Sequence, residues 1–380
     1  MLRTHDQADV RPIELFFDLV YVLAVTQLTH HLLEHLTLRG AGETLLLMLA
    51  VWVAWIHTTW TTNYFDREAR PVRLMLIGLM LVSLIMSASI PEAFDDRGLA
   101  FAGALVTIQV SGTTYLLSTL GRRHQLSPVF ARVAIWWAVI GLVWLAGGLA
   151  DGGARVVLWA IAVTLDYLVM WVGFPLPRLG RSRTTDYTIA GSHMAHRSYL
   201  FVIVALGESI LVTGANFGEL PGSAETVVAF VVAFVGSVAF WWIYFDRLEE
   251  AGQNMISSAS DPGRIALTAY TYCHIPMVAG IIVAAAADEQ TIAHPGEPAT
   301  VATAALILGG PTLYLVGHIL FKWALWRHVL RSRLLALAAL VALVPVAAVS
   351  SALALMAAAT AVLVALVLWD LRAERTTVSG

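Results

Sequence analysis

Two acidic residues lie one helical turn apart in the first apolar segment, ELFFDLVYVLAVTQ at 14–27. Helical spacing places Glu14 and Asp18 on one face, together with Tyr21. A carboxyl group at membrane depth costs on the order of 3 kcal/mol, so such a residue is a candidate for binding a cation or carrying a proton. We expect Asp18 to lie one to two turns below the cytoplasmic surface, within reach of water. The alternative is a structural hydrogen bond between helices, which contributes about 1 kcal/mol.

Other polar residues interrupt later apolar segments. Glu208 lies in ALGES at 205–209, and His274 precedes Pro276, which frees a backbone carbonyl one turn back. The candidate pathway or ligand-binding residues are Asp18, Glu208, Glu14, Asp166, His274, Gln27 and His57.

The pair His193 and His196 shares a helical face, as a metal site would require. No carboxylate or cysteine beside it in the sequence completes a ligand set. We therefore expect no metal and no other cofactor. The single Cys273 excludes an intrachain disulfide and a multi-cysteine metal site.

The elements that hold these residues are membrane spans. Charged residues make up 13% of the chain and apolar residues 58%, with a mean hydropathy of +0.75. These values predict an all-α integral membrane protein in contact with the lipid bilayer. About twelve segments have the roughly 20 apolar residues that a transmembrane helix needs. They are 13–36, 44–65, 72–91, 98–119, 131–149, 153–174, 197–217, 223–245, 264–286, 300–321, 333–350 and 352–370. The last two are so close that one of them could be re-entrant.

The basic residues predict the orientation of these spans. If the N-terminus is cytoplasmic, all but Arg39, Arg97 and Arg155 of the 23 basic residues fall on the cytoplasmic side. Acids such as Asp288 and Glu289 then fall in outer loops. The pattern therefore predicts a bacterial inner-membrane protein with both termini in the cytoplasm.

Three short matches indicate an internal repeat. YFDRE at 64–68 recurs as YFDRL at 244–248, PVRLMLIG at 71–78 as PGRIALTA at 262–269, and GTTYLL at 112–117 as PTLYLV at 311–316. They predict two homologous six-helix halves in parallel orientation, 1–174 and 197–380, joined by a basic cytoplasmic linker at 175–196. The repeated Asp66–Arg67 and Asp246–Arg247 pairs are expected to anchor helix ends at the headgroup level.

Several function classes are excluded by what the sequence lacks. It contains no phosphate-binding Gly-Lys-Ser/Thr loop, no zinc-protease His-Glu-x-x-His and no Gly-x-Ser-x-Gly nucleophile motif. No basic surface for nucleic acid is present. We expect neither nucleotide nor nucleic acid as a partner. The absence of these motifs favours a function other than that of an enzyme. Nothing in it indicates an oligomeric state.

Two segments carry a resemblance to a known family. RPIELFFDLVYVLAVTQLTHHL at 11–32 and HRSYLFVIVALGESILV at 196–212 resemble the bacterial low temperature requirement protein A (LtrA) family, over nearly the whole chain. The resemblance implies a polytopic membrane protein linked by its family name to growth in the cold. That family usually has Glu-Arg where this chain has His196–Arg197.

A weaker likeness connects FFDLVYVLAVT at 16–26 with the first helix of a potassium-channel family that also has six-span repeats. In that family the first helix of each repeat lines the pore. Here Phe17 replaces a serine of the motif, and the seventh span lacks the aspartate.

Together these features favour a channel or an ion-gradient-driven transporter for an ion or small polar solute. Its path would run between the two halves and be lined by the first and seventh spans. A membrane-embedded enzyme acting on a lipid or lipid-linked substrate is an alternative, which expects Asp18, His57 and His318 to cluster near the cytoplasmic leaflet. A stress-related membrane scaffold or sensor that does not transport is a further alternative.

Overall fold

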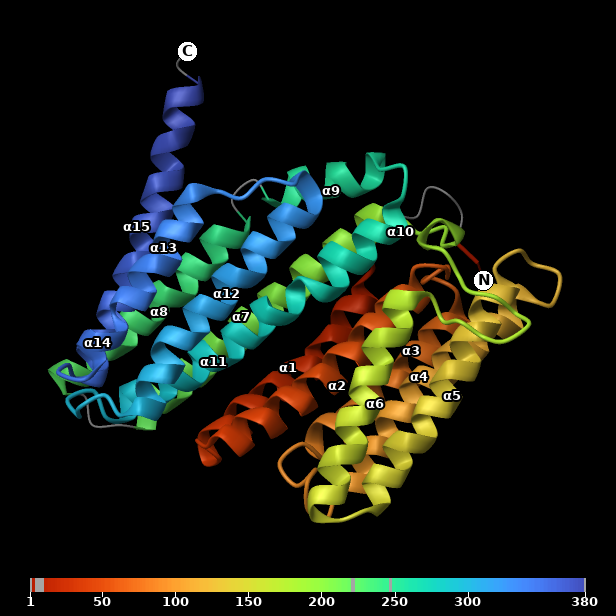
Figure 1. The fold of residues 1–380 in the computed structure, drawn as a ribbon, viewed down its shortest axis with the longest axis horizontal. Coiled ribbons are helices and arrows are strands. Elements are labelled where there is room, and N and C mark those ends of the chain that lie inside the picture. The colour runs from red at the N-terminus through yellow and green to blue at the C-terminus, as the bar shows by residue number, and fades with distance from the viewer. Residues whose placement is uncertain (1, 4–9, 220–222, 246–247, 379–380) are drawn as a thin grey trace. The chain divides into compact units, whose positions relative to one another are not determined.

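The computed structural model describes residues 2–3, 10–219, 223–245 and 248–378, and these ranges contain helices and no strand (Figure 1). Eleven of the helices there are long and apolar enough to cross a membrane, which confirms the predicted all-α membrane class. The helices are α1 (Pro12–Glu34), α2 (Leu38–Thr62), α3 (Arg70–Ala88), α4 (Gly98–Leu120), α5 (Ser127–Leu149), α6 (Gly152–Val172), η1 (Thr184–Asp186), α7 (Gly191–Glu219), α8 (Ala224–Phe245), α9 (Leu248–Ser258), α10 (Pro262–Ile265), η2 (Ala266–Tyr272), α11 (His274–Ala293), α12 (Val301–Trp326), α13 (Arg331–Ala342), α14 (Val344–Ala347) and α15 (Ala352–Val378).

The segment predicted as a span at 333–350 is broken in two. It forms α13 and the short α14, because Pro345 cannot donate to the helical ladder and its ring collides with the preceding turn. A bridge between Pro298 and Ser351 sets the residues before α12 beside those before α15. The chain between these helices therefore returns to the end where α12 began.

The chain divides into two compact units. Unit 1 comprises the residues up to His31, from Arg39 to Phe201 and from Gly252 to Thr271. Unit 2 comprises Leu32–Leu38, Val202–Ala251 and the residues from Tyr272 onward. The helix α7 contributes its first residues to unit 1 and the remainder to unit 2.

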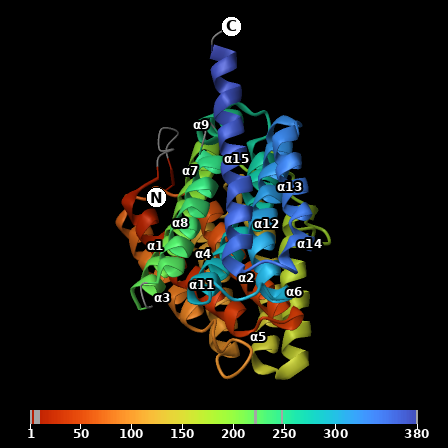
Figure 2. The ribbon, with the colours of Figure 1, turned by 90° about the vertical axis from the view of Figure 1, so that its left-hand side faces the viewer.

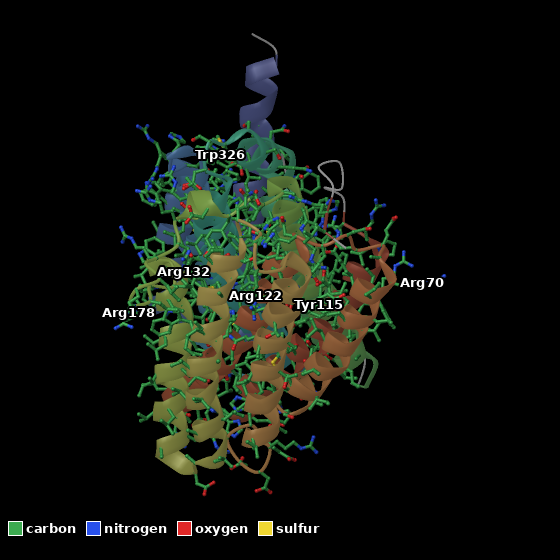
Figure 3. The ribbon with its side chains drawn as sticks, turned by 90° about the vertical axis from the view of Figure 1, so that its right-hand side faces the viewer. Arg70, Tyr115, Arg122, Arg132, Arg178 and Trp326 are labelled. Atoms are coloured by element: carbon green, nitrogen blue, oxygen red, sulfur yellow. The ribbon has the colours of Figure 1, made fainter. Side chains whose placement is uncertain are left out.

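In unit 1, α3 to α6 pack as sequential neighbours with alternating direction. Arg70 opens α3, Arg122 follows α4, Arg132 lies near the start of α5 and Arg178 follows α6. All four lie in one band across unit 1 (Figure 3). The basic residues thus mark one end of this bundle, as the charge pattern requires.

Arg155 lies at the opposite end of the bundle, at the start of α6. It is 4% exposed, and its guanidinium donates to the carbonyl oxygens of Ala150 (2.9 Å), Ala93 (3.1 Å) and Asp95. Loop carbonyls have no intrahelical donors, so a buried arginine here satisfies several of them at once. This explains an arginine at the end of the bundle that is otherwise poor in basic residues.

The segment between α6 and α7 folds back onto unit 1. Arg132 donates from Nη1 to the carbonyl of Leu179 (3.0 Å) and from Nε to Oγ of Ser182 (3.1 Å). The hydroxyl of Thr184 donates to Asp261 Oδ2 (2.6 Å), which ties the segment to the start of α10. These bonds fix the shape of the basic loop that separates the two helices.

A π-helical segment, η2, precedes α11. Pro276 frees a backbone carbonyl one turn back, and the widened turns of η2 end at Tyr272, one turn before that proline. π-helical turns are rare and occur often at functional sites. Thr271 in this segment accepts a hydrogen bond from Trp52 Nε1 at its backbone oxygen (2.8 Å).

In unit 2, α8, α11, α12 and α15 pack together (Figure 2). The helices α11 and α12 approach closely, because a Cβ at Gly310 would lie 2.8 Å from the backbone nitrogen of Ala284. The helix α11 continues to Ala293, so Asp288 is a 9% exposed residue within a helix rather than part of an outer loop. That placement corrects the expected end of the ninth span.

Candidate functional site

The acids of α1 face a complementary pair on α7. Glu14 Oε1 contacts His193 Nε2 at 2.8 Å, and Asp18 Oδ2 accepts a hydrogen bond from Arg197 Nη1 at 2.9 Å. Both contacts join residues 179 positions apart. This constant offset means that α1 and the first turns of α7 run parallel and in register. The acids Glu14 and Asp18, one turn apart on α1, therefore face His193 and Arg197, one turn apart on α7.

Asp18 is held by three donors. Arg197 Nη2 contacts Asp18 Oδ1 at 2.9 Å in addition to the Nη1 bond, and Trp55 Nε1 donates to the same Oδ1 at 2.8 Å. Two parallel guanidinium contacts are the strongest geometry for such a pair. Arg197 also donates to the carbonyl of Glu14 (2.8 Å) and lies 5.6 Å from the centre of the Trp55 ring, as in a cation–π contact.

Glu14 joins three elements of unit 1. Its Oε2 lies 3.2 Å from Nε of Arg67, which follows α2, and accepts the backbone N–H of Arg11 at 3.1 Å. Arg67 is 2% exposed. Burial lowers the pKa of the Arg67 guanidinium, whereas the nearby Glu14 acts to raise it. The arginine stays charged, because an arginine pKa lies far above neutral pH.

The Tyr-Phe-Asp-Arg segment was expected to anchor a helix end at the headgroup level, and its Arg67 is buried against Glu14 in unit 1. Asp66, beside it, is half-buried and accepts the backbone N–H of Glu68 at 3.1 Å. The matching residues Asp246 and Arg247 lie outside the described part of the chain.

Asn63 holds the histidine of this cluster. Its Nδ2 contacts His193 Nδ1 at 3.0 Å and donates to the carbonyl of Ala190 at 3.1 Å, while its Oδ1 accepts the Ala190 N–H at 2.8 Å. Both ring nitrogens of His193 therefore have a partner, one a carboxylate and the other an amide. The start of α7 is fixed to the end of α2 by these bonds.

We call this group the charge cluster: Glu14, Asp18, Arg67, His193 and Arg197. Two carboxylates meet two arginines there, and all five side chains are at most 2% exposed. The sequence led us to expect water near Asp18, but in the structure that residue is fully buried against Arg197 and Trp55. The cluster is closed to solvent and balanced in charge, and it connects α1, the end of α2 and α7.

The other candidate residues of unit 1 lie outside this cluster. Asp166 is fully buried and accepts hydrogen bonds from two uncharged donors, Trp144 Nε1 (2.9 Å) and Gln109 Nε2 (3.3 Å). Gln27 is half-buried on α1. His57 is 7% exposed, lies 3.2 Å from the Thr113 hydroxyl through Nε2, and borders a cavity of about 630 Å³.

Two candidates belong to unit 2. His274 is fully buried, and its Nε2 lies 2.7 Å from the hydroxyl of Tyr244. Glu208 is 5% exposed within α7. His318, which the enzyme hypothesis grouped with Asp18 and His57, is also a buried residue of unit 2.

Sequence reasoning missed the partners of the acids. From the sequence, Arg67 was expected to anchor a helix end at the headgroup level, and no partner was assigned to Arg197. A usable signal was present: His193 and Arg197 repeat the one-turn spacing of Glu14 and Asp18 with the opposite charge. Among the described residues, no three His, Cys, Asp or Glu side chains gather as a metal site would require.

Long apolar helices with enclosed, paired charges define a polytopic α-helical membrane protein. The chain matches the family model described as Bacterial low temperature requirement A protein (LtrA) over residues 9–368. An uncharacterized protein of Rhizobium meliloti (strain 1021) is 37% identical over 318 residues, which are 83% of this chain and 78% of that protein. No solved structure matches the chain. The chain therefore belongs to the LtrA family, which confirms the resemblance seen in the sequence.

Proposed function

We propose that this protein is a channel or an ion-gradient-driven transporter for an ion or small polar solute in a bacterial inner membrane. The path runs beside α1 and α7, and the charge cluster acts as its gate. The observation that carries the proposal is the two-rung ladder of Glu14–His193 and Asp18–Arg197. It joins α1 to α7 through groups that a membrane helix does not retain at low cost.

Buried ion pairs suit a gate for an energetic reason. The attraction between the two charges is largely offset by the loss of their hydration, so a buried pair adds little net stability over an apolar contact. If the helices separate and water or solute enters, both partners regain hydration and the opening costs little. A purely apolar contact would expose apolar surface to the same water and would gain no favourable hydration in compensation.

The proposed orientation has both termini in the cytoplasm. The band of arginines at one end of unit 1 supports it (Figure 3), since basic residues concentrate on the cytoplasmic side. The charge cluster lies at the start of α1 and the end of α2, and the basic loop before α7 leads into it. The gate is therefore assigned to the cytoplasmic end of the path.

Flux through proteoliposomes tests the proposal. Potassium, sodium and proton fluxes are measured for the wild type, Asp18→Asn and empty liposomes. Weakening the gate by about 1.4 kcal/mol would change the closed-to-open ratio tenfold. We expect a flux above that of empty liposomes for the wild type, and a flux at least tenfold higher for Asp18→Asn.

A matched control comes from unit 2. Asp370 also pairs with an arginine, since its Oδ2 lies 2.6 Å from Arg333 Nη1. Asp370→Asn should leave the flux unchanged. Equal fluxes for Asp18→Asn and the wild type would remove the gate, and wild-type liposomes no more permeable than empty ones would contradict transport of these ions.

The scaffold alternative draws on the same cluster. If the charge cluster only holds the helices together, neutralising Asp18 lowers stability and leaves every flux at the level of empty liposomes. The enzyme alternative gains no support from Asp18, because its carboxylate is paired with Arg197 and Trp55 inside the charge cluster.

A further inference from the structure

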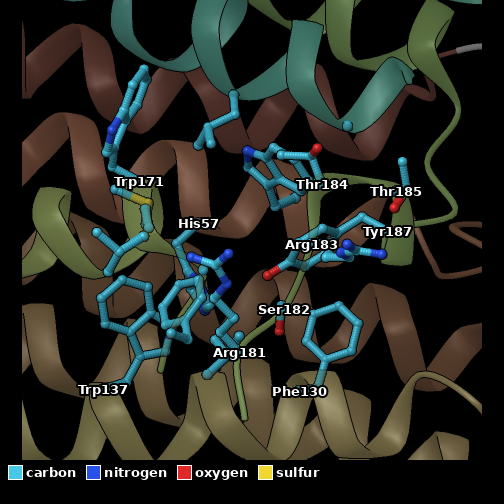
Figure 4. A pocket seen from close by; sticks show the side chains of 18 of the residues that line it. His57, Phe130, Trp137, Trp171, Arg181, Ser182, Arg183, Thr184, Thr185 and Tyr187 are labelled. Atoms are coloured by element: carbon cyan, nitrogen blue, oxygen red, sulfur yellow. The ribbon is translucent and has the colours of Figure 1, made fainter. Parts of the chain in front are cut away.

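A cavity of about 630 Å³ lies in unit 1 apart from the charge cluster. Its wall is formed by the last turns of α2 and α6, the first half of α5, the loop that follows α6, and the residues around α10 (Figure 4). This volume falls within the range of roughly 300–1,000 Å³ that is typical of pockets for small organic ligands.

One side of the cavity is aromatic and aliphatic. Phe130, Trp137 and Phe174 line it together with Trp60 and Met170. Trp137 meets both Phe174 and His57 edge to face at 5.5 Å, so the wall is well packed. Such a surface accepts a hydrocarbon chain, because apolar area removed from water contributes about 25 cal/mol per Å².

The cavity continues to the outer side of α6. Trp171 lines it and yet is 61% exposed, and Leu168 one turn earlier is 49% exposed. Large apolar side chains on the outside of a membrane helix face lipid. A molecule dissolved in the bilayer can therefore enter from the side.

Basic and hydroxyl side chains also line the cavity. Arg181 lies beside His57 and Trp137, whereas Arg183 lies near Tyr187 (Figure 4). Both arginines are exposed, and neither forms an ion pair with a carboxylate in the described ranges. Burial raises the pKa of Tyr187 to about 12, so its hydroxyl remains a hydrogen-bond donor at neutral pH.

Two acids close to these arginines in the sequence or bonded to the same loop, Asp186 and Asp261, accept hydrogen bonds from other groups. Asp186 accepts the backbone N–H of Arg183 at 2.8 Å, and Asp261 accepts both the Thr184 hydroxyl (2.6 Å) and the backbone N–H of Arg264 (2.9 Å). Neither carboxylate pairs with the guanidinium group of Arg181 or Arg183, so both groups can bind an anion beside an apolar wall. An arginine recognises a phosphate group through paired hydrogen bonds.

We propose that this cavity binds an anionic amphiphile with one hydrocarbon chain, such as a lysophospholipid, with its phosphate at Arg181 and Arg183 and its chain along the Trp137 wall. The bilayer is the source of the ligand. This site is separate from the proposed gate and does not depend on it. Ligand binding to the cavity is measured directly, whereas the gate is tested by ion flux.

Native mass spectrometry of the purified protein in a non-ionic detergent tests the site, with palmitoyl lysophosphatidylglycerol as the probe. We expect saturable binding of one molecule, and affinity about tenfold lower for the double variant Arg181→Gln/Arg183→Gln. Arg70→Gln/Arg122→Gln removes two charges from the same end of unit 1 outside the cavity and should bind as the wild type does (Figure 3). All four side chains are exposed or half-buried, so both double variants should fold.

Further probes separate the roles of charge and chain. Zwitterionic palmitoyl lysophosphatidylcholine should bind more weakly, and hexyl phosphate and inorganic phosphate should bind weakest. Equal affinity of both double variants, equal binding of the zwitterionic probe, or tight binding of inorganic phosphate alone would each overturn the proposal. Asp18→Asn, which alters the gate, should bind the probe as the wild type does, because the cavity and the gate share no residue.

Discussion

Asp18 and Arg197 form a two-contact ion pair, with both N–O distances at 2.9 Å and both side chains 1% exposed. The pair fixes the level at which α1 meets α7 in unit 1. Its net contribution to stability is small, but each partner depends on the other, because an unpaired buried charge is far more costly than a paired one.

Asp18→Asn should therefore destabilise the protein by about 3–5 kcal/mol, since it leaves Arg197 charged, buried and without its counter-ion. The measurement is the free energy of unfolding in detergent, from the denaturant dependence of far-UV circular dichroism.

The double variant Asp18→Leu/Arg197→Met supplies the control. It replaces both charges by apolar groups, which is often neutral for a buried pair. It should recover most of the stability that Asp18→Asn loses. If the double variant were as unstable as Asp18→Asn, the loss of stability would come from the missing ion pair and not from the unpaired charge of Arg197.

Arg67→Gln should cost about 2–3 kcal/mol, because it leaves Glu14 without one of its two cationic neighbours inside unit 1. Arg70→Gln is the comparison, as Arg70 is exposed at the start of α3. A surface substitution of this kind changes stability by no more than about 0.5 kcal/mol. Equal melting temperatures for the two variants would contradict the placement of Arg67 in the charge cluster.

Trp55→Phe tests the third donor to Asp18. The indole N–H donates to a buried carboxylate at 2.8 Å, and a hydrogen bond to a charged group contributes about 1.5–3 kcal/mol. Trp136→Phe removes an indole that donates to the Pro175 carbonyl at 2.9 Å near the surface, where water replaces it. We expect a measurable loss of unfolding free energy for Trp55→Phe alone, and similar losses for both would argue against a special role of Asp18.

The sequence was sufficient to predict the membrane class and most helices, because length and hydropathy decide whether a segment can cross a bilayer. It also singled out Glu14 and Asp18, since an acid in an apolar run is conspicuous. The ninth span was predicted to end at residue 286, with Asp288 in an outer loop, whereas α11 continues to Ala293 because its alanine-rich sequence favours helix.

The partners of the acids were beyond a reading along the chain. Arg67 and His193 are separated from Glu14 by long stretches, and local spacing does not determine which helices pack together. The cavity was missed for the same reason: Trp137, Tyr187 and Leu267 converge on it from three distant segments. Only the complementary one-turn spacing on α1 and α7 pointed to the contact.

The loop that lines the cavity begins at a glycine that tolerates no side chain. Gly173 ends α6 in a left-handed conformation with φ of 81°, and a Cβ there would overlap the carbonyl oxygen of Ser182. Gly180, in the same loop, has φ of 71° with open space around it. Both glycines have a positive φ, but only Gly173 lacks room for a Cβ atom.

Gly180→Ala should therefore cost about 1–2 kcal/mol, the strain of a left-handed alanine. Gly173→Ala should cost distinctly more, and it should also displace Ser182, whose N–H donates to the Gly173 carbonyl at 2.7 Å. The readouts are the unfolding free energy and the affinity for palmitoyl lysophosphatidylglycerol. We expect Gly180→Ala to bind the probe as the wild type does and Gly173→Ala to bind it more weakly. Identical stability and identical binding for the two variants would mean that the contact with Ser182 does not shape the cavity.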